Sequence, residues 1–214
     1  MPWVRRCVST DARWHYAPVV AYRALLFDVM GTLVHDPFYE DVPKALGMSL
    51  DALIEQKHPT AWVDFEQGVI DEDKLRTRFF LDGRDYPHDA MKAAMIEAYD
   101  WLDGTEAILG ELAERGHELH LLSNYPEWYR LIEDKLRLSR YADWSFVSCD
   151  MGVRKPDAEA YLRPVRQLAC QPEELLFIDD RARNCEGARE VGLDAIVFES
   201  AAQLRAELRD RGLL

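Results

Sequence analysis

Residues 25–34 have the sequence LLFDVMGTLV, and this stretch decides the fold. The short, continuous apolar run over 23–29 predicts a strand that is buried on both faces, as strands of parallel sheets are. The run leads into Asp28, and Gly31 and Thr32 follow as a flexible turn. An acid at the end of a buried strand is well placed for chemistry. Met30 is unexpected, because a second acid at its position would assist such chemistry.

Strands and helices alternate in the second half of the chain. Short apolar runs predict strands over 23–29, 117–124, 144–150, 174–180 and 194–200. Amphipathic segments predict helices over 105–116, 127–138, 157–169, 183–192 and 201–212. This alternation predicts an α/β fold, with a Rossmann-like, doubly wound parallel sheet and helices on both of its faces.

One region interrupts the alternation. Residues 37–103 contain no convincing strand pattern and are helical throughout, which predicts an all-helical insert after the first strand. The expected organisation is a core made of residues 23–36 and 104–214, an inserted cap over 37–103, and an N-terminal extension over 1–22.

Composition excludes several classes of function. The 214 residues carry 39 acids against 26 bases, a net charge of −13, so we expect no nucleic-acid partner. No apolar stretch approaches the roughly 20 residues of a spanning helix, so we expect no membrane association. The four cysteines form no CxxC pair and are expected to be reduced thiols. The sequence leaves the oligomeric state open.

The N-terminal extension bears on location. Residues 1–22 hold Arg5, Arg6 and Arg13 against the single acid Asp11. They lack the continuous apolar core of a secretory signal, so secretion is not expected. We expect a cytoplasmic protein, or one of the plastid stroma if this segment is the remnant of a targeting peptide.

Polar residues stand at the ends of successive predicted strands. In a parallel sheet these ends share one rim, where ligands bind. Each residue alone is an ordinary turn, cap or surface residue, but the ordered set points to a site. Its members are Asp28, Ser123, Asn124, Lys155, Asp179 and Asp180.

The segments DVMGT, LLSN, RKPD and FIDD stand in the order of the four motifs of the haloacid dehalogenase-like (HAD) superfamily, which this chain resembles from residue 23 to about residue 200. The helical insert resembles the C1-type cap of that superfamily. The resemblance implies a hydrolase in which Asp28 attacks phosphorus and forms an aspartyl-phosphate.

The same resemblance assigns roles around Asp28. It implies Mg²⁺ as cofactor, held by Asp28, the backbone carbonyl of Met30, and Asp180, with Asp179 in the outer shell or orienting a bound water. Lys155 is expected to neutralise the transferring group and Asp28. Phosphoryl oxygens are expected to bind Ser123 and the Asn124 amide, with Thr32 also near the substrate.

Met30 leaves three interpretations open, because phosphatases of the superfamily usually carry a second Asp there. The first is a phosphatase in which a better leaving group, a metal-bound water or a cap residue compensates, with His58, Asp64 and Glu66 as candidates. The second is a metal-independent 2-haloacid dehalogenase, against which the pair Asp179-Asp180 argues. The third is a catalytically inactive HAD-fold binding protein, against which the intact acids and Lys155 argue.

A finer resemblance concerns the substrate. Segments such as KHPTAWVDFEQGVIDEDKL and SNYPEWYRLIEDKLRLS resemble the FMN hydrolase group of plants and their photosynthetic relatives, which implies hydrolysis of FMN to riboflavin. Aromatic residues that are candidates to stack on a flavin, though at helical spacing they equally suit a core, are Trp62, Phe65, Tyr125, Trp128 and Tyr129. Phe38 and Tyr39 lie near the expected hinge of the cap. Sugar-phosphate or nucleotide phosphatases of the same superfamily are the alternatives.

Overall fold

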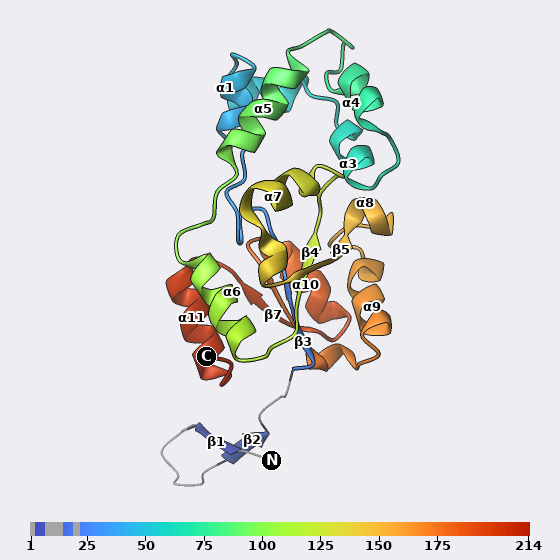
Figure 1. The fold of residues 1–214 in the computed structure, drawn as a ribbon. Helices are drawn as coiled ribbons and strands as arrows, with labels where there is room; N and C mark the ends of the chain where they lie inside the picture. The colour runs from blue at the N-terminus through green and yellow to red at the C-terminus, as the bar shows by residue number, and fades with distance from the viewer. Residues whose placement is uncertain (1–2, 7–14, 19–21) are drawn as a thin grey trace.

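A five-stranded parallel sheet forms the centre of the molecule in a computed structural model, which describes residues 3–6, 15–18 and 22–214. Its strands lie in the order β5-β4-β3-β6-β7, so the first strand of the core is central (Figure 1). The strands are β3 (Ala24–Phe27), β4 (Leu119–Ser123), β5 (Asp143–Val147), β6 (Leu175–Asp179) and β7 (Asp194–Val197). The predicted α/β fold is confirmed.

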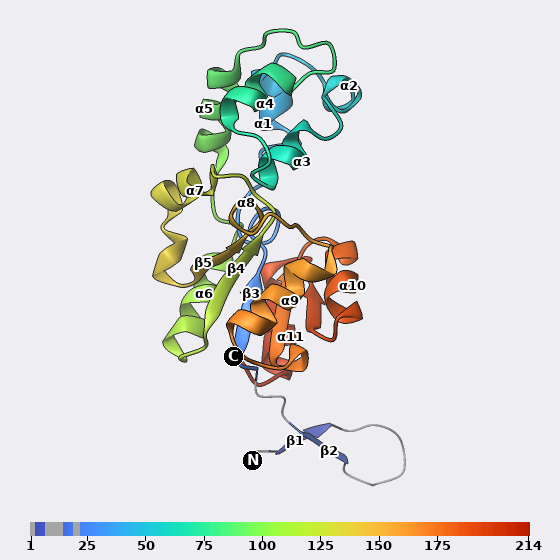
Figure 2. The same cartoon turned by 90° about the vertical axis from the view of Figure 1, so that its right-hand side faces the viewer.

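Helices cover both faces of this sheet, because alternate residues of each strand point to opposite sides. Leu25 and Phe27 of β3 belong to one buried cluster, and Ala24 and Leu26 belong to a second. The first cluster packs under α6 (Thr105–Glu114), α7 (Tyr129–Leu136) and α11 (Ala201–Asp210). The second packs under α9 (Ala158–Gln167) and α10 (Ala182–Glu190). In Figure 2, α6 and α7 lie on one side of the sheet, and α9 and α10 lie on the other.

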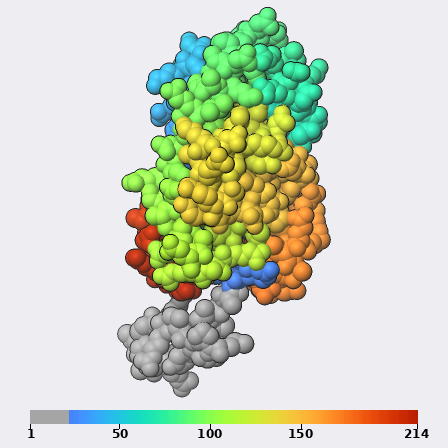
Figure 3. All heavy atoms as spheres, viewed as in Figure 1, coloured from blue at the N-terminus to red at the C-terminus, as the bar shows by residue number. Residues whose placement is uncertain are grey.

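The insert between β3 and α6 is helical, as its sequence predicts. It consists of α1 (Asp41–Ala45), α2 (Leu50–Gln56), α3 (Ala61–Glu66), α4 (Glu72–Arg78) and α5 (His88–Ala98). These helices lie directly on the core in the space-filling view (Figure 3). Part of the contact is made by α7, where Lys135 Nζ donates to the carbonyl of Glu97 over 2.6 Å. The boundaries 37 and 103 stay a prediction.

Two segments differ from expectation. The strand predicted over 144–150 ends at Val147, because the polar residues after it form the short helix α8 (Ser148–Met151). In the extension, β1 (Trp3–Arg6) pairs antiparallel with β2 (His15–Pro18), which the sequence did not indicate. Short 3₁₀ turns, η1 (Leu138–Arg140) and η2 (Pro172–Glu174), precede β5 and β6.

Strand register brings the polar residues together. Phe27 is paired with Leu121 of β4 and with Ile178 of β6, so the next residues, Asp28 and Asp179, end neighbouring strands at one edge.

In the described part of the chain, no helix has the length and apolar character to cross a membrane. Cys149, Cys170 and Cys185 are free thiols, and Cys7 lies outside the described residues.

Candidate active site

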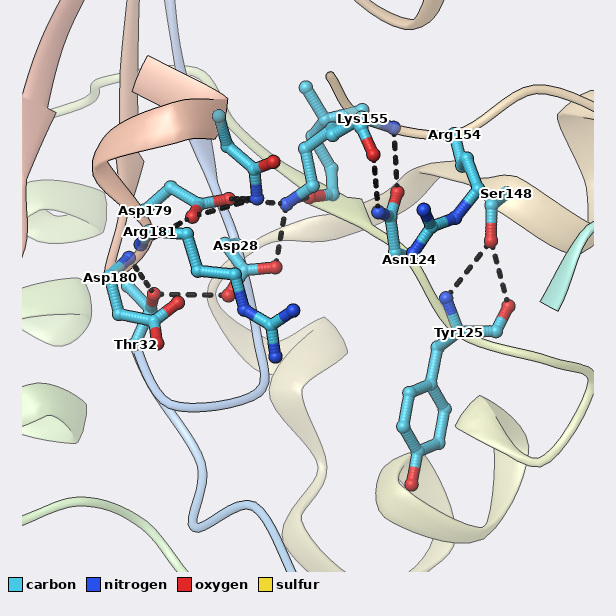
Figure 4. Close-up of polar contacts among 12 residues, drawn as sticks. Asp28, Thr32, Asn124, Tyr125, Ser148, Arg154, Lys155, Asp179, Asp180 and Arg181 are labelled. Atoms are coloured by element: carbon cyan, nitrogen blue, oxygen red, sulfur yellow. Dashed lines mark hydrogen bonds and ion pairs between the residues drawn. The ribbon is translucent and has the colours of Figure 1, made fainter. Parts of the chain in front are cut away.

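A buried lysine joins two aspartates at this edge. Lys155 Nζ lies 2.6 Å from Asp28 Oδ1 and 2.7 Å from Asp179 Oδ2, and it also donates to the carbonyl of Leu122 over 2.7 Å. Its side chain is 1% exposed. Figure 4 shows the ammonium between the two carboxylates. All three donor directions of the ammonium are therefore fixed, which holds Asp28 in place.

The acids of this cluster hold protons more tightly than free aspartates. Burial raises the pKa of Asp28 to about 7, although Lys155 pulls it down, and the nearby Asp179 raises it further. Burial also raises the pKa of Asp180, and again Asp179 adds to the effect. For Lys155, the two acids overcome the opposing effect of burial and raise the pKa of its ammonium. The cluster thus has more negative charge than one lysine can balance.

The turn after β3 is built around Asp180. Thr32 Oγ1 donates to Asp28 Oδ2 over 3.0 Å and accepts from the backbone N–H of Asp180 over 3.0 Å. Gly31 has φ of +81°, and a Cβ there would lie 2.7 Å from Asp180 Oδ2. Glycine is required for both reasons, since other residues avoid this backbone region and no side chain fits beside the carboxylate.

The acids can hold a divalent cation. Oxygens of Asp28, Asp179 and Asp180 all lie within 4.8 Å of one another. Among the described residues, Asp180 Oδ1 is the only fully buried side-chain nitrogen or oxygen with no hydrogen-bond partner. An orphaned carboxylate oxygen in a cluster of acids fits a hard cation such as Mg²⁺, which takes oxygen ligands. The residues present therefore fit the expected cofactor.

Asp179 differs from the other two acids. Asn184 Nδ2 lies 3.0 Å from both of its oxygens, and the backbone N–H of Arg181 donates to Oδ1 over 2.8 Å. With Lys155 added, both oxygens are already bound. The geometry therefore suits Asp179 for orienting Lys155 more than for ligating a cation directly.

Asn124 fixes the loop that carries the lysine. Its side chain donates to the carbonyl of Lys155 over 2.9 Å and accepts from the N–H of Lys155 over 2.8 Å. Both ends of this side-chain amide are engaged, so the side chain positions Lys155. Ser123, at the end of β4, is 1% exposed and does not line the neighbouring cavity.

A cavity of about 240 Å³ opens between these residues and the insert. The core side of the cavity is charged, and the side formed by the insert is largely apolar. Core residues at its wall include Asp28, Met30, Asn124, Tyr125, Lys155 and Asp180. Residues from the insert and its linker include Phe38, Tyr39, His58, Trp62, Glu66 and Phe79.

Several predicted residues lie elsewhere. Trp128 is 2% exposed and does not line the cavity, and its indole N–H donates to Glu72 Oε2 over 2.8 Å. The structure corrects its assignment as a substrate contact, because aromatic residues at helical spacing pack into the core here. Asp64 is also outside the cavity, since it binds Arg78 over 3.0 Å. Thr32 and Asp179 stand behind the cavity wall as supports of Asp28.

Sequence reasoning missed four charged residues of the cavity, Asp36, Lys57, Arg154 and Arg181. In the sequence, Arg154 directly precedes Lys155 and Arg181 directly follows Asp180. This adjacency to predicted site residues could have indicated both arginines. Arg154 Nε donates to Glu66 Oε2 over 3.1 Å, and this contact joins the core to the insert. Figure 4 shows the Arg181 side chain extending past Asp28. Asp36 has no local signal, because its sequence context is that of an ordinary turn.

Comparisons with known proteins agree with this geometry. Residues 22–192 match the model of the haloacid dehalogenase-like hydrolases. The chain is 48% identical over 189 residues to flavin mononucleotide hydrolase 1, chloroplastic, of Arabidopsis thaliana, covering 88% of this chain and 77% of that protein. It is 25% identical over 198 residues to D-ribitol-5-phosphate phosphatase of Bacteroides thetaiotaomicron, covering 86% and 95%.

A solved structure of a HAD family enzyme has a similar fold. This chain is similar, with a TM-score of 0.66 and 20% identity, to a HAD family enzyme of Bacteroides thetaiotaomicron crystallised with magnesium and inorganic phosphate, covering 84% of this chain and 95% of that one. The family model spans most of the chain, and the Arabidopsis relative is nearly half identical to it. The chain therefore belongs to the family of haloacid dehalogenase-like hydrolases.

Proposed function

We propose that this hydrolase is a Mg²⁺-dependent phosphatase that transfers the phosphoryl group of a small monoester, FMN first of all, to Asp28. The observation that carries the proposal is the contact of Lys155 Nζ with Asp28 over 2.6 Å, beside an Asp180 oxygen that has no partner. Such a site holds a nucleophile and balances the charge of an incoming phosphate.

The residues of the chain share the work of phosphoryl transfer. Thr32 and Lys155 hold Asp28 by its two oxygens, so the carboxylate meets phosphorus in a fixed orientation. Lys155 balances the negative charge that develops when the two anions meet. Asn124 fixes the backbone of Lys155 through both ends of its side-chain amide. The expected contacts of phosphoryl oxygens with Ser123 and the Asn124 amide stay a prediction.

The expected metal has a defined place in this scheme. Asp28, Asp180 and the backbone carbonyl of Met30 would hold it, with Asp179 in support. When bound, Mg²⁺ neutralises the carboxylates and the phosphoryl oxygens, which allows two anions to approach. The fit rests on the cluster of three acids and on the orphaned oxygen of Asp180.

Two observations support FMN among phosphate monoesters. The 48% identical relative is named a flavin mononucleotide hydrolase, and a more distant relative is named for D-ribitol 5-phosphate. FMN is a ribitol 5-phosphate that carries a flavin ring, so the two names share one phosphate-bearing group. In this chain Trp62, Tyr125 and Phe79 give the cavity apolar walls that suit a flat ring.

The other interpretations make distinct predictions. A metal-independent dehalogenase has no need for the acid cluster, and its activity would survive EDTA. An inactive binding protein has no need for a nucleophile held by both oxygens. Sugar phosphates and nucleotides remain alternative substrates because they carry the same reacting group.

A phosphate-release panel tests the proposal. It contains FMN, ribitol 5-phosphate, other sugar phosphates and nucleotides, each with Mg²⁺ and with EDTA, and uses wild type and Asp28→Asn. We expect FMN to react fastest, and we expect EDTA and Asp28→Asn each to abolish release. A flat response across the panel, with Asp28→Asn equal to wild type, would falsify the proposal.

We also propose a location for this chain. The Arabidopsis relative is named as chloroplastic, which supports the plastid stroma over the cytoplasm for this chain. A fluorescent fusion to the carboxyl end of the full chain distinguishes the two compartments.

A further inference from the structure

Met30 leaves the reaction without a proton donor at the usual place. Its thioether has no ionisable proton to offer the leaving group, and the residue is 8% exposed and packs in the first core cluster. The alkoxide released from an alkyl phosphate such as FMN is a poor leaving group unless it is protonated. A side chain that supplies this proton has to lie at the cavity, and the structure provides few choices.

Asp36 is a buried acid at the same cavity. It belongs to the linker between β3 and α1, and its side chain is 19% exposed. Oδ1 accepts the backbone N–H of Phe38 over 3.0 Å, whereas the nearest cation to Oδ2 is Arg181 at 4.0 Å. Burial raises the pKa of this carboxyl, against the opposing effects of Phe38 and Arg181. One oxygen of Asp36 is thus available to carry a proton.

Arg181 connects this acid to the reacting centre. Its guanidinium lies near Asp36, and its side chain extends past Asp28 in Figure 4. Burial opposes the charge of Arg181, yet Tyr39, Asp180, Asp28 and Asp36 together raise the pKa of the guanidinium. Asp28 and Asp36 therefore act electrostatically on the same cation, and all three residues line the cavity.

The other acid of the cavity is already committed. Glu66 accepts from Trp62 Nε1 over 2.7 Å on Oε1 and from Arg154 Nε over 3.1 Å on Oε2. Burial raises the pKa of Glu66, as it does that of Asp36, although Arg154 opposes the effect. The two acids differ in geometry, because both oxygens of Glu66 are bound, at 2.7 and 3.1 Å, whereas the nearest cation to Asp36 Oδ2 is 4.0 Å away. Protonating Glu66 would break the ion pair that joins the insert to the core.

His58 at the cavity is less suitable. His58 Nδ1 accepts the backbone N–H groups of Thr60 over 3.3 Å and Ala61 over 3.2 Å, so the proton of the ring is on Nε2. A neutral imidazole N–H is a much weaker acid than a carboxylic acid.

We propose that Asp36 is the proton donor for the leaving group in this chain and takes the place of the acid that Met30 cannot supply. The inference rests on the proposed phosphatase function. The bond from Asp28 to phosphorus forms, the bond from phosphorus to the alcohol oxygen breaks, and the Asp36 proton moves to that oxygen. In the second step water attacks phosphorus, the bond to Asp28 breaks, and a proton of the water returns to the Asp36 carboxylate.

The test measures how strongly the rate depends on the leaving group. The kcat/KM for FMN and for a series of ring-substituted phenyl phosphates is compared in wild type, Asp36→Asn, Asp36→Ser and Glu66→Gln. Both replacements of Asp36 keep an acceptor for the Phe38 N–H, so the local turn is preserved. Thermal melting verifies the fold, and Asp64→Asn, which lies outside the cavity, is the matched control.

We expect both Asp36 variants to lose about 100-fold or more on FMN and on the poorest leaving groups, but about tenfold or less on 4-nitrophenyl phosphate. A plot of log kcat/KM against leaving-group pKa then becomes steeper, which a merely structural role would not cause. An unchanged slope in the folded variants overturns the proposal, as does a slope that steepens only in Glu66→Gln. If wild type hydrolyses neither FMN nor any phenyl phosphate, the phosphatase function itself fails.

Discussion

The two ends of the cavity are built on different principles. At the core end, Asp28, Lys155 and Asp179 are fixed by contacts of 2.6 and 2.7 Å between residues on three separate elements of the core. At the end formed by the insert, the wall is mostly aromatic and aliphatic, and the ion pair of Glu66 with Arg154 joins it to the core. Charge dominates the first end and shape dominates the second.

This difference separates two tasks. Positioned charges act on the phosphoryl group, which every monoester shares, so the core end sets the reaction. Apolar walls act on the part of the substrate that differs between monoesters, so the insert sets the choice of substrate. Substitutions at the core end should therefore reduce the rate for all substrates alike. Substitutions at the end formed by the insert should reduce the rate for some substrates more than for others.

The largest effect is expected from Lys155→Met. The change leaves Asp28 and Asp179 buried without their cation, which should reduce the free energy of unfolding by about 3–5 kcal/mol and abolish turnover of every substrate. Urea denaturation and phosphate release measure the two effects. Turnover within tenfold of wild type would contradict the central role of this contact.

Asp180→Asn should have the next largest effect. It removes charge from the orphaned oxygen while keeping its size, so the apparent affinity for Mg²⁺ should fall about 10- to 100-fold. The Mg²⁺ concentration that gives half-maximal activity measures the affinity, and the exposed Asp210→Asn is the control. An equal Mg²⁺ requirement in the two variants would place the metal elsewhere.

The two ends of the cavity also differ in how well the sequence predicts them. Asp28 and Asp180 stand at strand ends and were predictable, because parallel strands must finish at one edge. Lys155 lies beyond α8, and the RKPD motif indicated it. The insert was predictable as helical, but the side chains facing the cavity were not. Trp128 and Trp62 have similar sequence contexts, and only packing puts Trp62 at the cavity and Trp128 in the core. Asp36 reaches the cavity through the path of the linker, which no local pattern reveals.

Glu66→Gln should act unequally on substrates. Glutamine can still accept from Trp62 but loses its charge attraction to Arg154, so the insert is held less firmly against the core. We expect KM for FMN to rise about tenfold, with a smaller change for a phosphate that lacks the ring. Steady-state kinetics with Asp64→Asn as control checks this, and equal effects on both substrates would remove the proposed division of tasks.

The smallest expected effect concerns pH. Because the pKa of Asp28 is raised from an ordinary 3.8 to about 7 without metal, the folded chain binds a proton that the unfolded chain has released. Stability of the metal-free protein should thus fall as pH rises through this range. Mg²⁺ must displace that proton, so its stabilising shift in Tm should be larger one pH unit above about 7 than one unit below. Equal shifts would show that Asp28 is ionised throughout.

The central claim is that Asp28 attacks phosphorus. It is tested most directly by quenching the wild-type protein during turnover of FMN with Mg²⁺, reducing it with borohydride, and sequencing its peptides by mass spectrometry. Borohydride reduces an acyl phosphate to an alcohol. We therefore predict that Asp28 alone is converted to the alcohol, and only when FMN and Mg²⁺ are both present. Formation of riboflavin and phosphate with Asp28 unmodified at every quench time would contradict the account.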